Sequence, residues 1–372
     1  MRYRSELEVD FRVLKENFDL LRELTPSNKV VFMVKANAYG HGLLECSKFA
    51  SEELDVDSLG VASLGEAVHL RKSLPSMNTD ILVLSDTGMM FNHVRELYLD
   101  YNISPVLSSI EDLKDFLEDK RFQHAPLLLK VDTGMNRLGI LPTEVDKACS
   151  LMKAHGRRSI EHLMTHFACS YKKFREGDKT DKQNKLFQKI KKQIRDESIS
   201  INKTSCANSG AIEQGIGLGE SHIRPGLMLY GPGISMDKNG WTGKNVSSLK
   251  TYVIKCVSIK KGTPIGYGGH VCHADGFIVY LPIGYGDGLL SYYSKSEIEI
   301  EGEVGKVMGR VNMDMAAIWF PKDAKTSFKR GQIVRIWDHD RFSVTRLAMA
   351  AKTVPYQVFT AINPRVPRSY IV

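Results

Sequence analysis

The sequence predicts an α/β protein in which a (β/α)8 barrel is followed by a C-terminal, mainly antiparallel β domain. Eight apolar, β-rich runs lie between residues 30 and 227, and stretches of helix length separate them. Strands that alternate with helices build a parallel sheet, and eight such units match a closed barrel. Beyond residue 249, short alternating runs continue without a helix-length stretch until about residue 344, which is typical of an antiparallel sheet. A length of 372 residues suits two domains.

The eight barrel strands are expected at 30–34, 58–63, 80–85, 103–108, 126–132, 160–168, 202–209 and 222–227. The periodicity predicts helices at 43–53, 65–72, 93–99, 111–118, 143–154 and 181–195, and a short turn at 211–214. We therefore expect the barrel over residues 8–235 and the β-rich domain over 236–372. The alternating segment Ser5–Asp10 suggests that residues 1–7 can help to add a strand to the second domain. A doubly wound sheet of eight strands is the alternative, because the strand count alone does not separate the two folds.

Composition and charge exclude several classes of protein. No run of 18 apolar residues exists, so a membrane-spanning helix and a membrane partner are not expected. The N-terminus has no apolar core, which indicates a cytoplasmic location rather than secretion. The net charge of +8 is concentrated in the lysines of 171–195, whose helical spacing indicates a solvated face and not a nucleic-acid site. The pattern His270-x-Cys272-His273 lacks a second ligand cluster, so no metal is expected.

Lys35 ends the most apolar run of the chain, VVFMV at 30–34. Lysine is rarely buried without a partner, and the carboxyl end of a barrel strand faces the side where barrel enzymes do their chemistry. Burial there lowers the pKa of an amine and makes it a base or a Schiff-base nucleophile near neutral pH. A lysine that simply reaches for solvent at a strand end is the alternative for this position taken alone.

Other polar residues lie at the ends of the later strands, and they favour a catalytic role for Lys35 over a lysine that only reaches for solvent. Arg137 follows the fifth strand, His166 the sixth, Asn208 and Ser209 the seventh, and Arg224 lies in the eighth. The small turns at 209–210 and 225–226 can present backbone N–H groups to an anion such as a phosphate. A lysine and a phosphate site in one barrel suggest pyridoxal 5'-phosphate, which needs a Schiff-base lysine and a group that tunes its pyridine nitrogen.

The segment VKANAYGHG at 34–42 resembles the pyridoxal-phosphate attachment motif of alanine racemases. The resemblance extends along most of the chain and its order matches the family throughout. The further blocks are KVDTGMNRLG (130–139), THFA (165–168), CANSGA (206–211), RPGLMLYG (224–231), GYGDG (284–288), GRVNMDM (309–315) and PYQVFTAINPRVPR (355–368).

The resemblance implies roles for residues of this chain. Lys35 would hold the cofactor as an aldimine and act as one base, and Tyr267 would be the second base, supplied by the partner of a homodimer with shared active sites. Arg224 would contact the pyridine nitrogen, and His166 would form a hydrogen bond with Arg224. Arg137 would lie beside the phenolic oxygen and the substrate carboxylate. Two bases suit racemisation, because a proton leaves one face of Cα and returns to the other. Arginine does not yield its proton, so it leaves the ring nitrogen uncharged.

The remaining implied site residues fall into three sets. The cofactor, and its phosphate above all, would contact Tyr39, Asn208, Ser209, Gly226, Leu227 and Tyr356. The substrate pocket would include Tyr285, Met313 with its backbone N–H, and Asp314. Lys130 matches a lysine that is carbamylated in some relatives, where it provides a negative partner for the arginine that Arg137 matches. The family usually has an acidic residue near position 171, where this chain has Tyr171-Lys172-Lys173, which affects the expected substrate path.

The function implied is the interconversion of L-alanine and D-alanine, which supplies D-alanine for cell-wall peptidoglycan. A racemase for serine or with broad specificity is one alternative. A barrel-type amino-acid decarboxylase is another, but it would need an acidic partner for the pyridine nitrogen where this chain has Arg224. A non-catalytic pyridoxal-phosphate-binding protein is the third, and it would consist of the barrel alone, without the domain that carries Tyr267.

Overall fold

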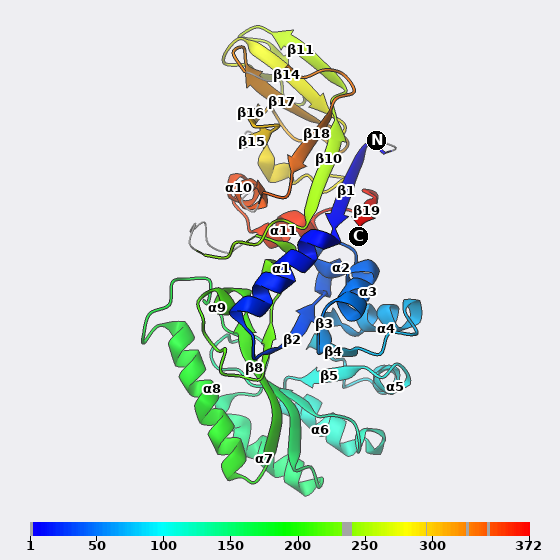
Figure 1. Ribbon diagram of the computed structural model, residues 1–372, viewed down its shortest axis with the longest axis vertical. Coiled ribbons are helices and arrows are strands. Elements are labelled where there is room, and N and C mark those ends of the chain that lie inside the picture. Colours follow the sequence, from blue (N-terminus) through cyan, green and yellow to red (C-terminus); the bar gives the residue numbers. More distant parts are fainter. Residues whose placement is uncertain (1–2, 233–239, 295, 325–326, 341–342) are drawn as a thin grey trace. The chain divides into compact units, whose positions relative to one another are not determined.

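The computed structural model of the chain describes residues 3–232, 240–294, 296–324, 327–340 and 343–372 (Figure 1). Its contacts divide it into two compact units. We call residues 19–38 and 43–228 the barrel unit, and residues 1–18, 39–42 and 229–372 the β unit. The domain boundaries at 8, 235 and 236 expected from the sequence stay a prediction.

The barrel unit contains eight strands that pair in parallel and close on themselves in the order β2-β3-β4-β5-β6-β7-β8-β9. They are β2 (Lys29–Met33), β3 (Ser58–Ser63), β4 (Asp80–Asp86), β5 (Ser104–Leu107), β6 (Leu128–Lys130), β7 (Ser159–Met164), β8 (Ser200–Asn208) and β9 (His222–Arg224). Pairing of Lys29 with His222 and of Val30 with Ile223 closes the ring. The fold class predicted from the sequence is therefore confirmed, and a doubly wound sheet is excluded for this unit. Several strands end earlier than expected; β7, for example, ends at Met164, and residues 165–168 form a loop.

Helices lie outside the strands and connect them (Figure 1). They are α1 (Phe11–Leu24), the short turn α2 (Lys35–Tyr39), α3 (Leu43–Glu53), α4 (Leu64–Ser73), α5 (Asn92–Asp100), α6 (Ile110–Glu118), α7 (Val145–Ala154), α8 (Lys179–Asp196) and α9 (Ser209–Glu213). Capping side chains mark where α6 and α8 begin. Ser109 accepts the N–H of Asp112 at 2.9 Å before α6, and Asp178 accepts the N–H of Asp181 at 2.8 Å before α8; each bond satisfies an N–H that the first turn leaves free.

The barrel core is formed by apolar strand residues that are buried on both faces, as parallel strands under helices are. In β2 the side chains of Val30, Val31 and Phe32 are fully buried. On the helices, one apolar stripe is buried, which in α6 consists of Ile110, Leu113 and Phe116. This packing fixes where the strands end, and therefore where the polar residues that follow them lie.

The β unit contains two larger sheets and a hairpin (Figure 1). Ser5–Asp10 forms β1, which pairs antiparallel with β10 (Ser247–Tyr252) and parallel with β19 (Arg368–Ile371), and β18 (Ile333–Trp337) completes that sheet. The second sheet has the order β11-β14-β17-β16-β15. Its strands are β11 (Lys255–Ile259), β14 (Gly276–Leu281), β17 (Ala316–Pro321), β16 (Glu303–Val307) and β15 (Glu297–Ile300), and the hairpin is β12 (Pro264–Ile265) with β13 (His270–Val271). The helices α10 (Ser343–Ala350) and α11 (Pro355–Thr360) follow.

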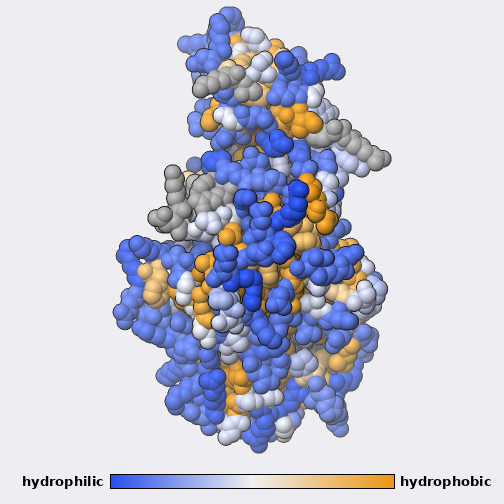
Figure 2. Space-filling model, in the orientation of Figure 1, coloured by the Kyte–Doolittle hydropathy of each residue, from blue (hydrophilic) through white to orange (hydrophobic). Residues whose placement is uncertain are grey.

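Hydrophilic side chains cover most of the face drawn in Figure 2, and hydrophobic residues show there only in small groups. Among the described helices, none combines the length and the apolar character that a membrane span requires.

Candidate active site

Lys35 is placed by an unusual backbone. The four residues after it, Ala36 to Tyr39, all have positive φ angles between 50° and 57°, in the left-handed region that costs about 1–2 kcal/mol for each residue with a Cβ. Side chains hold this turn in place: Oε1 of Glu66 accepts the N–H of Ala36 at 2.6 Å, and Oδ1 of Asn37 accepts the N–H of Leu43 at 2.8 Å. Strain of this kind is concentrated at functional sites.

The amine of Lys35 has no hydrogen bond or ion pair within the described part of the chain. Burial lowers the pKa of Lys35, and the positive charges of Arg137 and Arg224 lower that pKa further, while Glu66 opposes them. The amine is therefore easier to deprotonate than an ordinary lysine. A neutral amine is what a nucleophile or a base requires.

Lys130 adds a second buried amine to the same end of the barrel. Burial, followed by the charges of Arg224, Arg137 and Lys35, lowers the pKa of Lys130 to about 8. The nearby Asp132 does not neutralise this positive charge by an ion pair, because backbone N–H groups bind its carboxylate. Gly134 donates to Oδ1 at 2.8 Å, and Arg137 donates to Oδ2 at 3.1 Å. The barrel end thus carries a net positive charge that suits an anionic ligand.

Arg224 is 6% exposed and is held by two acceptors, one in β8 and one in the residue that follows β7. Its Nη1 donates to Oγ of Ser205, and its Nη2 donates to the carbonyl oxygen of Thr165. Three of its five N–H groups have no protein acceptor among the described residues. Burial lowers the pKa of Arg224 to about 10, which leaves the guanidinium charged at neutral pH.

The hydrogen bond expected between His166 and Arg224 is not formed, so this detail of the sequence prediction is wrong. Nε2 of His166 lies 3.5 Å from Nδ2 of Asn208 instead. Burial, together with the charges of Arg224, Lys130 and Lys35, holds the pKa of His166 well below its ordinary value. The imidazole is therefore neutral. Thr165 and Ser205 lie beside the guanidinium instead, and neither contact was predicted from the sequence.

The segments that follow β8 and β9 bring together the residues expected at a phosphate. Oγ of Ser209 accepts the N–H of Gly226 at 2.9 Å and the N–H of Met228 at 3.4 Å. Asn208 caps α9 by accepting the N–H of Ala211 at 3.1 Å. Leu227 is buried, and its N–H donates to no protein acceptor among the described residues. This turn offers hydroxyl and amide donors of the kind that bind phosphate.

Tyr39 and Tyr356 belong to the β unit and lie together. Their ring centroids are 5.8 Å apart, and Tyr39 also stacks on Tyr230 at 4.9 Å. Burial raises the pKa of the Tyr39 hydroxyl above its ordinary value. Tyr39 therefore stays protonated and can donate a hydrogen bond.

The other predicted residues of the β unit lie on exposed loops. Tyr267 is at the tip of the β12–β13 hairpin and is 72% exposed. Two further loops meet where Tyr285 donates its N–H to the carbonyl of Asn312 at 3.0 Å and Gly286 donates to the carbonyl of Met313 at 2.9 Å. Tyr285, Met313 and the neighbouring Asp314 are all about half exposed. These loops present aromatic and apolar side chains to the outside of the unit.

The structure also identifies residues that sequence reasoning missed. They are Glu66, which pins the turn after Lys35, Ser205 and Thr165, which hold Arg224, and Arg365 with Asp287, which anchor the Met313 loop. Asp287 and Arg365 lie inside blocks that carry the family resemblance, so that resemblance was a signal for them. Ser205 and Glu66 gave no such signal, because a single serine or glutamate in the sequence shows no spacing that points to a site.

Fold and site together define a barrel enzyme with a partly buried lysine after its first strand and a cationic, anion-binding end. Family models narrow this class. The model of the alanine racemase N-terminal domain matches residues 9–233, and that of the alanine racemase C-terminal domain matches residues 246–370. The chain belongs to the alanine racemase family.

Individual relatives agree with this assignment. The chain is 31% identical to alanine racemase 1 of Clostridium acetobutylicum, over 98% of this chain and 94% of that protein. Among solved structures, it is similar to an alanine racemase of Clostridium difficile 630, with a TM-score of 0.85, 25% identity, and coverage of 100% of this chain and 96% of the other. The fold of an alanine racemase from Bartonella henselae, solved with covalently bound pyridoxal phosphate, matches with a TM-score of 0.86 at 24% identity, over 99% of this chain and 100% of that one.

Proposed function

We propose that this chain is an isomerase that interconverts L-alanine and D-alanine, with pyridoxal 5'-phosphate bound through the amine of Lys35. The observation that carries the proposal is this amine: it is partly buried, has a lowered pKa, and has no protein partner among the described residues. An amine in that state is ready to bond to an aldehyde carbon. Membership of the alanine racemase family supports alanine as the substrate.

The residues of the barrel end fit this cofactor. When bound, pyridoxal phosphate withdraws electrons and so stabilises negative charge on the substrate Cα. The charged Arg224 has N–H groups to spare and keeps its own proton, so it can bind the ring nitrogen without protonating it. The turn that contains Ser209, Gly226 and Leu227 provides donors for the phosphate, and we assign Tyr39 and Tyr356 to the same group.

Racemisation needs a second base on the opposite face of Cα, and we assign that role to Tyr267. Lys35 exchanges the proton of D-alanine, and Tyr267 exchanges that of L-alanine. The exposure of Tyr267, Tyr285 and Met313 supports the further proposal that they act in the site of a second copy of the chain, in a homodimer. Arg137 and the N–H of Met313 bind the substrate carboxylate in this arrangement.

The decisive experiment is an assay of the purified chain, supplied with pyridoxal phosphate, on a panel of L-amino acids. Chiral chromatography measures the D-enantiomer, and released CO2 is measured in parallel. We expect alanine to be racemised fastest, and the Lys35→Ala variant to be inactive. If serine is converted faster than alanine, the chain is a racemase of broader specificity and the proposal of alanine as its substrate is wrong. If CO2 is released and no D-alanine forms, the chain is a decarboxylase.

A further inference from the structure

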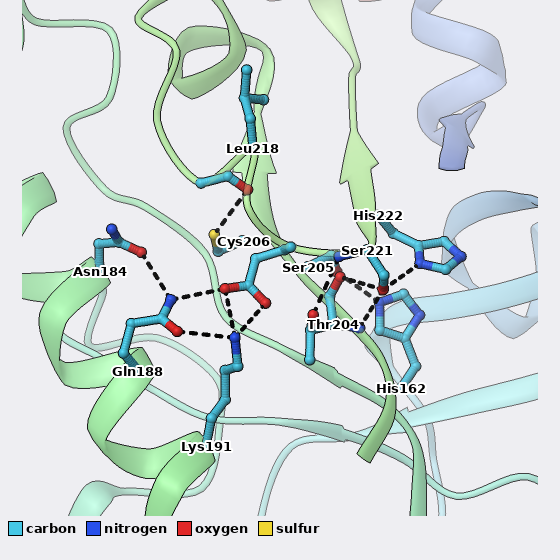
Figure 3. Close-up of polar contacts among 12 residues, drawn as sticks. His162, Asn184, Gln188, Lys191, Thr204, Ser205, Cys206, Leu218, Ser221 and His222 are labelled. Carbon is cyan, nitrogen blue, oxygen red and sulfur yellow. Dashed lines mark hydrogen bonds and ion pairs between the residues drawn. The ribbon is translucent and has the colours of Figure 1, made fainter. Parts of the chain in front are cut away.

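A chain of hydrogen bonds leads from Arg224 in β9 to a buried histidine two strands away. Oγ of Ser205, in β8, accepts from Nη1 of Arg224 and lies 2.8 Å from Nε2 of His162, in β7. Figure 3 shows His162 and Ser205 pointing toward each other, with Ser221 and His222 beside them. Ser205 is 0% exposed and His162 is 2% exposed, so water does not compete for these bonds.

The direction of each bond follows from the chemistry of the groups. Arginine has no acceptor, so Ser205 accepts from Arg224. The hydroxyl of Ser205 has one proton of its own, and its other partner is Nε2 of His162. A hydroxyl oxygen can accept two bonds, but if Ser205 also accepted from Nε2, its own buried proton would have no acceptor among the described residues. The proton of Ser205 is therefore assigned to the bond with Nε2, and the ring proton to Nδ1. His162 is in this way fixed as a neutral acceptor.

The surroundings of His162 agree with this assignment. Burial, followed by the nearby His222 and Arg224, holds the pKa of His162 well below its ordinary value. The ring of His222 lies 5.1 Å away, centroid to centroid, and its Nε2 is 3.2 Å from Oδ2 of Asp57. The carboxylate of this cluster is thus next to His222 and not next to His162. A protonated His162 would have no carboxylate partner and would face the guanidinium.

We propose that Ser205 and His162 are positioning residues for Arg224, which they orient through one directed chain of hydrogen bonds. The inference rests on the proposed function, because it concerns the arginine that we assign to the cofactor ring nitrogen. Thr165 holds Nη2 through its carbonyl oxygen and Ser205 holds Nη1, so the two acceptors fix the plane of the guanidinium. Without the hydroxyl of Ser205 only the hydrogen bond to Thr165 remains, and the guanidinium can rotate about that bond.

The first test needs neither cofactor nor activity. Nitrogen-15 NMR of the histidine-labelled chain without cofactor, with the His162→Gln variant to assign the signal, reports the protonation of each ring nitrogen. We expect a neutral His162 at pH 7 with its proton on Nδ1. A proton on Nε2, or a charged ring, would overturn the direction of the chain and with it the proposal.

The second test uses the loaded enzyme and three variants. We expect Ser205→Ala and His162→Leu each to lower kcat by about 10-fold, to change KM little, and to shift the absorbance band of the bound cofactor. The double variant should lose no more than the worse single one, because the two residues act as a unit. Thr204→Val is the matched control: it removes a buried hydroxyl from the neighbouring position of β8. That hydroxyl contacts Ser221 and Glu220, and not Arg224.

The outcomes separate the inference from the proposed function. An equal loss in Thr204→Val, or an unchanged cofactor band in Ser205→Ala and His162→Leu, would show that the two residues only fill space and would refute positioning. If the unaltered chain racemises no amino acid, the proposed function fails, whereas the NMR result still decides the hydrogen-bond direction. Should Ser205→Ala fail to fold, the NMR measurement and His162→Leu still test the proposal.

Discussion

Asp287 and Arg365 form an ion pair beneath the loops that carry Tyr285 and Met313. Nε of Arg365 lies 2.7 Å from Oδ1 of Asp287, whose side chain is 1% exposed. Nη2 of the same arginine reaches Oδ1 of Asp314 at 2.5 Å. Arg365 therefore links a buried carboxylate to the exposed loop that we assign to substrate binding.

We predict that Asp287→Asn destabilises the protein although it barely changes shape. The N–H of Gly284 donates to Oδ2 of Asp287 at 2.8 Å, and Arg365 donates to Oδ1. An amide must turn its NH2 toward one of these donors, and loss of such charge-assisted bonds costs about 2 kcal/mol. Urea unfolding at pH 7 measures the change, with Asp323→Asn on the exposed surface as control. Equal stability of the two variants would contradict the prediction. We also expect a higher KM for alanine.

Labelling should identify Lys35 as the attachment site. Borohydride reduction of the loaded enzyme, followed by peptide mapping, should find the pyridoxyl group on Lys35 and not on Lys130. Both amines have lowered pKa values, but only Lys35 directly precedes the strained turn. Lys35→Ala should lower the racemisation rate by about 1,000-fold or more, because it removes a general base as well as the attachment. A label on another lysine would refute the cofactor assignment.

Much of this architecture could be predicted from the sequence, for physical reasons that differ between elements. The barrel strands were predictable because runs such as 30–34 are apolar on both faces, which is what a parallel strand under helices requires. Lys35 was predictable because a lysine at the end of such a run is unusual, and the β domain because alternation replaces helical periodicity after residue 249.

The partners of these residues could not be predicted in the same way. The partners of Arg224 depend on which side chains face each other across β7, β8 and β9, and no periodicity encodes that register. Resemblance suggested His166 for this contact, but the structure has Ser205 and the carbonyl of Thr165 there. The left-handed turn after Lys35 was equally hidden, because alanine, asparagine and tyrosine do not signal positive φ as glycine does.

The lowered pKa of Lys130, about 8, leads to a prediction about CO2. Carbamylation requires the neutral amine, and the neutral fraction of Lys130 should rise as the pH passes from 7 to 9, well below the range of an ordinary lysine near 10.5. With 13C-labelled bicarbonate, NMR should show a carbamate signal that grows over this range and is absent in Lys130→Gln. If the signal persists in that variant, another amine is modified.

The charge of Arg224 should decide how strongly the cofactor withdraws electrons. A carboxylate in Arg224→Glu favours a protonated ring nitrogen, so we expect racemisation about 100-fold slower, a new long-wavelength absorbance during turnover, and more transamination. Arg158→Glu, at an exposed position of the barrel unit, makes the same charge change and should have none of these effects. An unchanged rate and spectrum in Arg224→Glu would mean that this arginine does not face the ring.

The proposed dimer makes a quantitative prediction about pairs of inactive variants. Lys35 belongs to the barrel unit and Tyr267 to the β unit, and we propose that each active site combines Lys35 of one copy with Tyr267 of the other. Lys35→Ala and Tyr267→Phe homodimers should then both be nearly inactive, because every site in them lacks one base.

Mixing these two variants under conditions of subunit exchange should restore activity. A mixed dimer has one site with both defects and one with neither, because each copy supplies the base that the other lacks. Random exchange makes about half of the dimers mixed, each with one intact site, so about a quarter of the activity of the unaltered enzyme should return. Native mass spectrometry counts the mixed dimers in the same sample, and mixing Lys35→Ala with itself is the control. If mixed dimers form but stay inactive, both bases come from one chain, and the shared site is wrong.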